Sequence, residues 1–214
     1  HYPLRRQRQM CIRDSSSTRP KARVRMIHSP RFKVVLDACV LYPAPIRDIL
    51  LSLAAEGVFI AKWSDIIQDE WLRNLLKNRT DLKKEQLNQT ITAMNLAFPD
   101  ANVEDFEDLI PSLKLPDRDD RHVVACAIRC NADLIVAFNS RDFPKDELSK
   151  FDIEIQKPDE LILNLFDINP ELACKAFNKM VKRLKNPKKT KNEVLATLEN
   201  CGLRESVEKL KNNC

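Results

Sequence analysis

The sequence is short of glycine, with only Gly57 and Gly202 among 214 residues. Phosphate-binding loops of the Walker and dinucleotide types need several closely spaced glycines, because their backbone amides must approach the phosphates. The chain also contains no apolar run near the roughly 20 residues that span a bilayer, and no segment ordered like a secretory signal. We therefore exclude these phosphate loops and predict a soluble, cytoplasmic protein without a membrane segment.

The seven cysteines are scattered along the chain and odd in number. A chain of this length can bury enough apolar surface to fold without disulfides, so we expect the thiols to be reduced. Cys126 and Cys130 lie four residues apart on a predicted helix, but no second Cys or His pair accompanies them at the spacing of a zinc site. We therefore predict that both are small buried apolar residues.

The net charge of +5 comes from the first 25 residues, which hold eight Lys and Arg and a single acid, Asp14. Without that segment, 28 basic and 30 acidic residues remain, a balance of −2. The segment has no hydrophobic periodicity, and its stretch QRQMCIRDS resembles translated sequencing-adapter sequence. We predict that residues 1–25 are a non-native or disordered basic tail and that Met26 is the natural start. The alternative is a basic arm that binds nucleic acid.

The remaining chain alternates short strands with helical segments. Phe32–Leu36 and Asp133–Phe138 are β-branched or aromatic runs typical of buried parallel strands, and Ile153 and Ile155 mark a further edge strand. This alternation predicts a three-layer α/β/α domain with a parallel central sheet over residues 30–165. From Pro158 onward the pattern is wholly helical, and residues 168–214 are predicted to form a small helical C-terminal region.

Three carboxylates stand together in LPDRDDRHVVACAI, residues 115–128. Asp residues before a helix often cap its N-terminus, so capping is the first interpretation to consider. Asp120, however, precedes Val123 and Val124 by three and four residues and so shares their core-facing side of the helix. An ionised carboxylate at the edge of a core must be hydrogen-bonded, paired or bound to a metal. Asp120 is therefore a candidate metal ligand.

Other oxygen-bearing side chains follow the same logic. Asp37 ends the first strand, Asn139 and Asp142 follow a later strand, and Glu70 shares the inner face of the helix that begins at Ser64. The carboxyl ends of parallel strands meet at one edge of a sheet, where sites are commonly built. Carboxylate oxygens suit Mg²⁺ or Mn²⁺ better than zinc or copper. These positions predict a metal site formed by Asp37, Glu70, Asp120 and Asp142, which could activate water and stabilise negative charge on a phosphodiester.

Four segments in this order resemble PIN-domain nucleases, particularly the VapC-type toxins of toxin–antitoxin pairs: VVLDACVLYPAPIRDILL, WSDIIQDEWLRNLL, LPDRDDRHVVACAI and ADLIVAFNSRDFP. The resemblance covers roughly residues 30–165, and the helical tail is similar to an extra C-terminal region of some VapC-type proteins. It implies that Asp37, Glu70 and Asp120 are the core acids of a metal site. It also implies that Asp142 or Asn139 takes a variable fourth position, while Asp117 and Asp119 cap the helix or support the ligands.

The implied activity is metal-dependent endonucleolytic cleavage of RNA, in which metal-activated water attacks phosphorus. The implied partners are the RNA substrate, a cognate antitoxin that covers the acids, and a second copy of the chain in a homodimer. Cys39 departs from the family pattern, because relatives often carry Asn, Ser or Thr there and a thiol is a poorer Mg²⁺ ligand and a weaker donor. The alternative function is therefore a catalytically weak or inactive PIN-fold module that binds RNA or protein.

Cys39 also argues against a haloacid-dehalogenase-like phosphatase. That class needs a second Asp two residues after its nucleophilic Asp, because the second carboxyl group acts as general acid. Here Cys39 stands in that place, two residues after Asp37. We therefore reject this class of enzyme.

Residues 175–191 contain eight Lys and Arg and no acid. Such a run can neutralise RNA phosphates, and we predict Lys182 and Arg183 as substrate-binding residues. The alternative is a solvated helix face followed by a basic linker. Trp63 and Trp71 could stack on bases, but we interpret them as core residues. 

His122 follows the acid cluster directly. A histidine in this position could shuttle protons, but a metal-bound water needs no histidine base. We interpret His122 as structural or surface-exposed.

Overall fold

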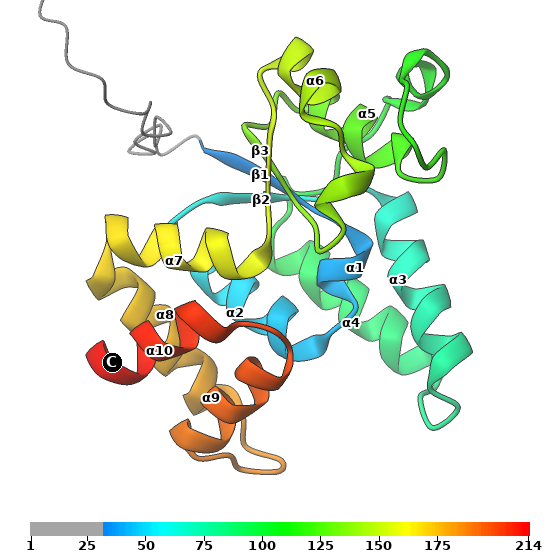
Figure 1. Cartoon of the computed structure of the whole chain (residues 1–214). Coiled ribbons are helices and arrows are strands. Elements are labelled where there is room, and N and C mark those ends of the chain that lie inside the picture. The colour runs from blue at the N-terminus through cyan, green and yellow to red at the C-terminus, as the bar shows by residue number, and fades with distance from the viewer. Residues whose placement is uncertain (1–31) are drawn as a thin grey trace, which may run out of the picture.

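The structure of the protein is a computed structural model that describes residues 32–214. The predictions for residues 1–25 and for Met26 lie outside the described residues. Figure 1 shows a sheet flanked by helices, with α2 (Ala44–Ala55) below it and α5 (Arg121–Arg129) above it. No helix within residues 32–214 is both long and apolar enough to cross a membrane.

The sheet has four strands in the order β2-β1-β3-β4, and every neighbouring pair is parallel. The strands are β1 (Lys33–Leu36), β2 (Ile60–Lys62), β3 (Leu134–Val136) and β4 (Glu154–Gln156). The middle strands β1 and β3 are rich in Val, Leu and Ile and almost wholly buried, as expected of strands covered on both faces. The predicted parallel α/β/α architecture is confirmed, including the edge strand around Ile155.

The helices of the first two thirds of the chain begin largely where the sequence predicts. Ser64 starts α3 (Asp65–Asn78), and its Oγ accepts a hydrogen bond from Ile67 N at 3.3 Å. The helix α4 (Lys84–Ala97) follows, and a 3₁₀ helix, Glu107–Ser112, leads toward α5. Trp63 and Trp71 are both fully buried, which confirms their interpretation as core residues.

Short elements at the carboxyl edge of the sheet were not predicted. A one-turn helix α1 (Ala38–Leu41) follows β1 directly, because Asp37 Oδ1 accepts from Ala38 N at 2.7 Å and starts the turn. After β3 the chain forms a 3₁₀ turn at Ser140–Asp142, then α6 (Lys145–Leu148) and a second 3₁₀ turn, Ser149–Phe151. These turns position the acidic side chains described below.

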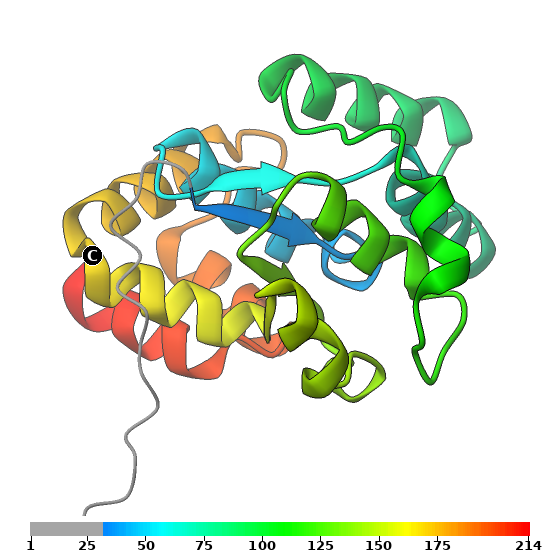
Figure 2. The same ribbon diagram turned by 90° about the horizontal axis from the view of Figure 1, so that it is seen from above.

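The C-terminal region contains α7 (Pro158–Ile168), α8 (Pro170–Arg183), α9 (Lys191–Asn200) and α10 (Arg204–Asn213). It is attached firmly to the rest, because α8 packs along α2 and α7 packs against α8 and α10. Figures 1 and 2 show α7, α8 and α10 gathered toward the amino ends of the strands. The acids, by contrast, follow the carboxyl ends.

Polar contacts reinforce the packing of α8 on α2. The Nζ atoms of Lys175 and Lys179 lie 2.8 and 2.5 Å from the carboxylate oxygens of Glu56, and Arg183 donates a hydrogen bond to Ser52 Oγ. The three basic residues are spaced by four and therefore share one face of α8. Part of the basic run thus holds the C-terminal region against α2.

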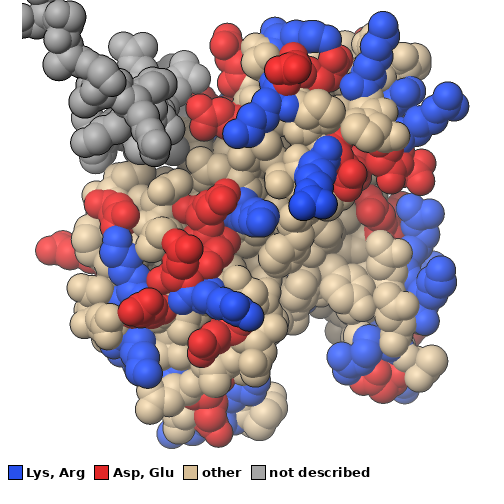
Figure 3. Space-filling model, in the orientation of Figure 1, with Lys and Arg blue, Asp and Glu red and all other residues tan. Residues whose placement is uncertain are grey.

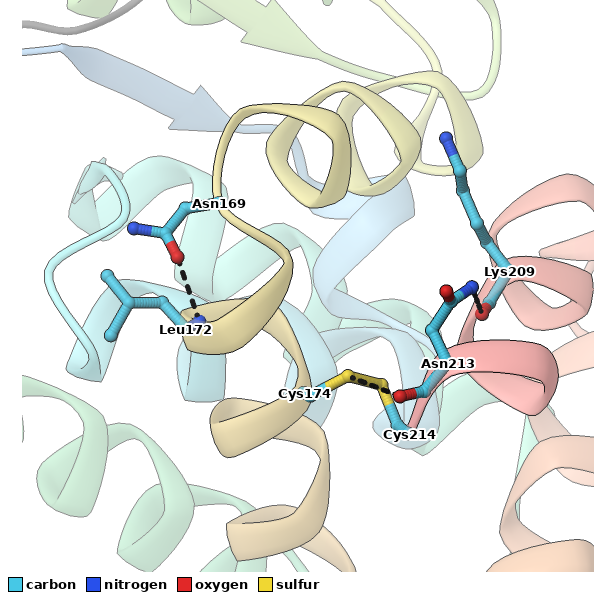
Figure 4. Close-up of a disulfide and its surroundings, with 6 residues drawn as sticks. All are labelled: Asn169, Leu172, Cys174, Lys209, Asn213 and Cys214. Atoms are coloured by element: carbon cyan, nitrogen blue, oxygen red, sulfur yellow. Dashed lines mark hydrogen bonds between the residues drawn. A yellow bond between two sulfur atoms is a disulfide. The ribbon is translucent and has the colours of Figure 1, made fainter.

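Two cysteines depart from the expected reduced state. Cys174 on α8 and Cys214 after α10 form a disulfide with a Cα–Cα distance of 5.2 Å, as Figure 4 shows. The prediction of reduced thiols was wrong for this pair, because the packing of α10 on α8 brings together residues 40 positions apart. The same view shows Asn169 Oδ1 accepting from Leu172 N at 3.0 Å, which caps α8. Among the described residues, Cys39, Cys126, Cys130 and Cys201 remain free thiols.

Candidate active site at the carboxyl edge of the sheet

Asp37 occupies the end of β1 and is only 3% exposed. Its backbone N–H donates to Val136 O at 3.1 Å, and its Oδ1 accepts from Ala38 N. Burial raises the pKa of Asp37, and the negative charge of Glu70 acts in the same direction. The Cys39 thiol and the Ala38 amide only partly offset this rise. The ionised form of Asp37 is therefore costly unless a positive charge lies beside it.

Asp120 immediately precedes α5, where a capping residue would stand. Its side chain makes no capping hydrogen bond, however, and its Oδ2 is buried without any hydrogen-bond partner. Burial is the main cause that raises the pKa of Asp120 to about 7, and the charge of Asp37 adds to it, followed by those of Asp117, Asp142 and Glu70. Helix capping does not account for this carboxylate.

The other two acids of the motif have different surroundings. Asp117 Oδ1 accepts a hydrogen bond from Asp119 N at 2.8 Å, which stabilises the turn that leads into α5. Both residues are exposed. Asp117 therefore holds the loop, and Asp119 offers a charge-matched neighbour against which Asp120 can be compared.

Glu70 and His122 meet across the two helices α3 and α5. The Nε2 atom of His122 lies 3.2 Å from Glu70 Oε2, with the two side chains 11% and 36% exposed. The other ring nitrogen of His122, Nδ1, is buried without a partner. His122 thus belongs to the candidate site and holds Glu70, a contact that the sequence alone could not indicate because the two residues lie on separate helices.

The turn after β3 is tied to the turn after β1 through Cys39. Phe138 N–H donates to Cys39 Sγ at 3.3 Å, and the thiol faces Asn139 Oδ1 at 3.7 Å. Asn139 Nδ2 in turn donates to Asp142 Oδ2 at 2.7 Å. Burial raises the pKa of the Cys39 thiol and keeps it protonated. Cys39 acts here as a neutral link between the two turns.

The four predicted catalytic acids influence one another but do not form a closed cage. Asp37, Asp142 and Glu70 all raise the pKa of Asp120 through their charges. Within residues 32–214, no three His, Cys, Asp or Glu side chains are close enough to share one metal ion as they lie. The unpartnered Asp120 Oδ2 and the oxygen-only donor set nevertheless fit a hard divalent cation such as Mg²⁺ or Mn²⁺.

Lys182 and Arg183 lie on α8, away from this edge. Arg183 is engaged with Ser52 of α2. Lys182 is exposed and takes part in none of the ion pairs found among residues 32–214. Figure 3 shows acidic and basic side chains interspersed over the C-terminal helices on this face. The role of both residues in substrate binding stays a prediction.

Replacing Asp120 by Asn is expected to stabilise the metal-free protein increasingly as pH rises. Folding raises the pKa of Asp120 from 3.8 to about 7. The wild-type protein therefore begins to lose stability as the pH rises above about 4, and the loss is complete once the pH exceeds about 7. Allowing for partial exposure, the wild type should fall behind Asp120→Asn by about 1–2 kcal/mol between pH 4 and pH 8. Urea unfolding in EDTA measures this gap. A gap of constant size would contradict the assignment of the burial cost to Asp120.

The parallel α/β/α fold with acids near its carboxyl edge fits a PIN-type domain, and comparison with known proteins shows this family. The PIN domain family model matches residues 33–141, just over half of the chain. The chain therefore belongs to the PIN-domain family. A second model, the VapC50 C-terminal domain, matches residues 158–212, beginning at the first residue of α7. More particularly, this is a VapC-type PIN protein with a C-terminal extension.

One curated relative illustrates the likeness. The Mycobacterium tuberculosis protein named "Putative ribonuclease VapC50" is 34% identical over 79 residues. The match covers 37% of this chain and 47% of that protein, so the chain aligns with about half of its relative. No solved structure matches the chain.

Proposed function

We propose that the protein is a Mg²⁺- or Mn²⁺-dependent endoribonuclease and the cytoplasmic toxin of a toxin–antitoxin pair. The observation that carries the proposal is the carboxylate of Asp120, whose Oδ2 is buried without a partner and whose pKa is raised by burial and then by the charges of neighbouring acids. The name of the curated relative, which describes a ribonuclease, supports the choice of RNA.

The chain's own residues suggest a division of roles. Asp37, Glu70, Asp120 and Asp142 would hold the cation, and Asn139 either supports Asp142 through its amide or adds its own oxygen. When bound, the cation would lower the pKa of an attacking water and neutralise charge on the scissile phosphate. His122 keeps Glu70 at the site through its Nε2 contact, and Cys39 fixes the turn that carries Asn139. A cognate antitoxin would inhibit the enzyme by covering these acids.

The chemistry of the products tests this proposal. If water is the nucleophile, the RNA 2′-hydroxyl takes no part in bond breakage, and cleavage should leave no 2′,3′-cyclic phosphate. An RNA with a single 2′-deoxy nucleotide at the mapped cleavage position should therefore still be cut, within about tenfold of the all-RNA rate. End analysis by mass spectrometry decides the matter. A cyclic phosphate product, or complete loss of cleavage at the deoxy position, would overturn hydrolysis by water.

Three lysines of the basic run that do not pair with residues of α2 are exposed near the loop between α8 and α9, where they could bind RNA. Lys182, Lys185 and Lys188 are exposed and take part in none of the ion pairs found among residues 32–214. A variant with all three changed to Glu is expected to bind single-stranded RNA more weakly and to lower the salt slope of log K by about 2, since each phosphate contact contributes about 0.7. Fluorescence anisotropy across a salt series measures both quantities.

A charge-matched control keeps this prediction specific. Lys77, Lys84 and Lys211 are also exposed but lie on α3, α4 and α10. Changing these three to Glu alters net charge equally, so an equal loss of affinity in both variants would assign the effect to overall charge and remove the loop from the RNA-binding surface.

A further inference from the structure

Three large apolar residues are exposed within residues 32–214: Leu96 at 78%, and Phe151 and Phe138 only in part, at 39% and 37%. Phe138 alone adjoins the candidate site, because it follows β3 by two residues and directly precedes Asn139. Phe151 lies at the opposite edge, in a hollow that it shares with Asp133, the residue before β3. A partly exposed aromatic side chain beside the candidate acids offers apolar surface that a ligand bound there could bury.

The backbone that carries Phe138 is held on both sides. Its own N–H donates to Cys39 Sγ at 3.3 Å, and the preceding Ala137 N–H donates to Gln156 O at 3.2 Å. The following Asn139 is tied to Asp142 at 2.7 Å. The turn that carries Phe138 is therefore fixed, and a ligand that contacts the exposed part of its side chain would not need to order a flexible loop first.

We propose that Phe138 is a stacking platform for an unpaired nucleobase next to the scissile phosphate of single-stranded RNA. The inference rests on the proposed function, because the acids of the candidate site define where a phosphate would react. Every base offers a flat π-face, so an aromatic ring in this place binds RNA without reading a particular sequence. A base in a duplex has both faces stacked already and cannot use the platform, so Phe138 favours unpaired RNA over duplex RNA.

Binding measured without cleavage tests the platform. A fluorescent single-stranded RNA and the matching duplex are titrated with the full chain in EDTA. Phe138→Ala is expected to weaken single-strand binding by about 5- to 100-fold, the range of one base–aromatic stack, and duplex binding by less than about twofold. Phe138→Tyr keeps a ring and should retain wild-type affinity. Phe151→Ala is the matched control, because it removes an equally exposed ring from the other edge of the sheet, and it should bind as the wild type does.

An abasic scan sharpens the result. Removing the bases of the RNA one at a time should reveal one position at which wild type and Phe138→Ala bind alike, because the stacked base is then missing. Single-strand affinity within about twofold of wild type for Phe138→Ala, or equal losses for single strand and duplex, would overturn the platform. The test of catalysis is separate. If the protein does not cleave RNA in Mg²⁺ but Phe138→Ala still weakens single-strand binding, the stacking proposal stands and the proposed nuclease activity is wrong.

Discussion

Asp120→Asn is expected to reduce RNA cleavage at least about 100-fold, whereas Asp119→Asn should change it less than about threefold. The two acids are neighbours in sequence, but Asp119 is exposed while Asp120 has a buried oxygen with no partner and a raised pKa. If Asp120 only capped α5 or only added negative charge near the site, its replacement would affect cleavage about as much as the replacement of Asp119. Initial rates on one RNA, with both proteins shown to be folded by circular dichroism, measure the difference.

The stability of the Asp120→Asn protein gives a second measurement of the role of Asp120. Asn at position 120 removes repulsion from Asp37, so the metal-free Asp120→Asn protein should unfold at a higher temperature than the wild type at pH 8. Loss of activity together with gain of stability is the behaviour of a functional residue that the fold tolerates at a cost. If Asp120→Asn lost both activity and stability, Asp120 would instead be a structural residue.

Mg²⁺ or Mn²⁺ is expected to raise the thermal unfolding midpoint of the wild type by about 5–10 °C at a concentration 100 times its dissociation constant, where binding contributes about 2.7 kcal/mol. In the proposed site, the cation would offset the repulsion among Asp37, Glu70, Asp120 and Asp142. Asp37→Asn should lose most of the shift. Differential scanning calorimetry with NaCl of equal ionic strength separates binding from screening.

The Asp119→Asn variant serves as the control for this measurement too. It removes one negative charge from the same motif without touching a buried carboxylate. A shift of equal size in wild type, Asp37→Asn and Asp119→Asn would mean that the cation binds elsewhere or only screens the surface.

The sheet could be predicted because its strands carry their signal locally. The Val, Leu and Ile runs of β1 and β3 are buried on both faces, and Ser64 caps α3 as its position before an apolar stripe indicates. The one-turn helix α1 was missed because four residues show no periodicity. It depends instead on Asp37, which serves both as the strand end and as the cap of the next turn.

The sequence could propose residues for the candidate site but could not predict the contacts among them. Strand ends and helix faces identify Asp37, Glu70 and Asp120, because each position follows from local periodicity. The pairing of His122 with Glu70 and the link from Cys39 to Asn139 join residues 52 and 100 positions apart in the sequence. No local pattern encodes such contacts, so they emerge only when the helices and strands are assembled.

The basic run shows the opposite limitation. Eight cationic residues with no acid among them suggest one surface, yet Lys175, Lys179 and Arg183 contact Glu56 and Ser52 of α2. A charge count cannot distinguish side chains that hold two regions together from those that face solvent. The disulfide escaped prediction for a related reason, because only the packing of α10 on α8 brings Cys214 to Cys174.

Cys39 is central to the choice between an enzyme and an inactive binding module. The thiol is a poor ligand for a hard cation, but its sulfur accepts from Phe138 N–H and faces Asn139, and its raised pKa keeps it neutral. The structure thus gives Cys39 a positioning role that requires no metal contact. The presence of Asp37, Glu70, Asp120 and Asp142 in the chain supports the proposed enzyme over an inactive module.

RNA cleavage by the full chain, compared in Mg²⁺ and in EDTA, tests metal-dependent ribonuclease activity most directly. We expect mixed RNA to be cut in Mg²⁺ or Mn²⁺, to remain intact in EDTA, and to be cut again when excess cation is restored. Cleavage that proceeds equally in EDTA, or RNA that stays intact in both cations, would contradict the proposed activity.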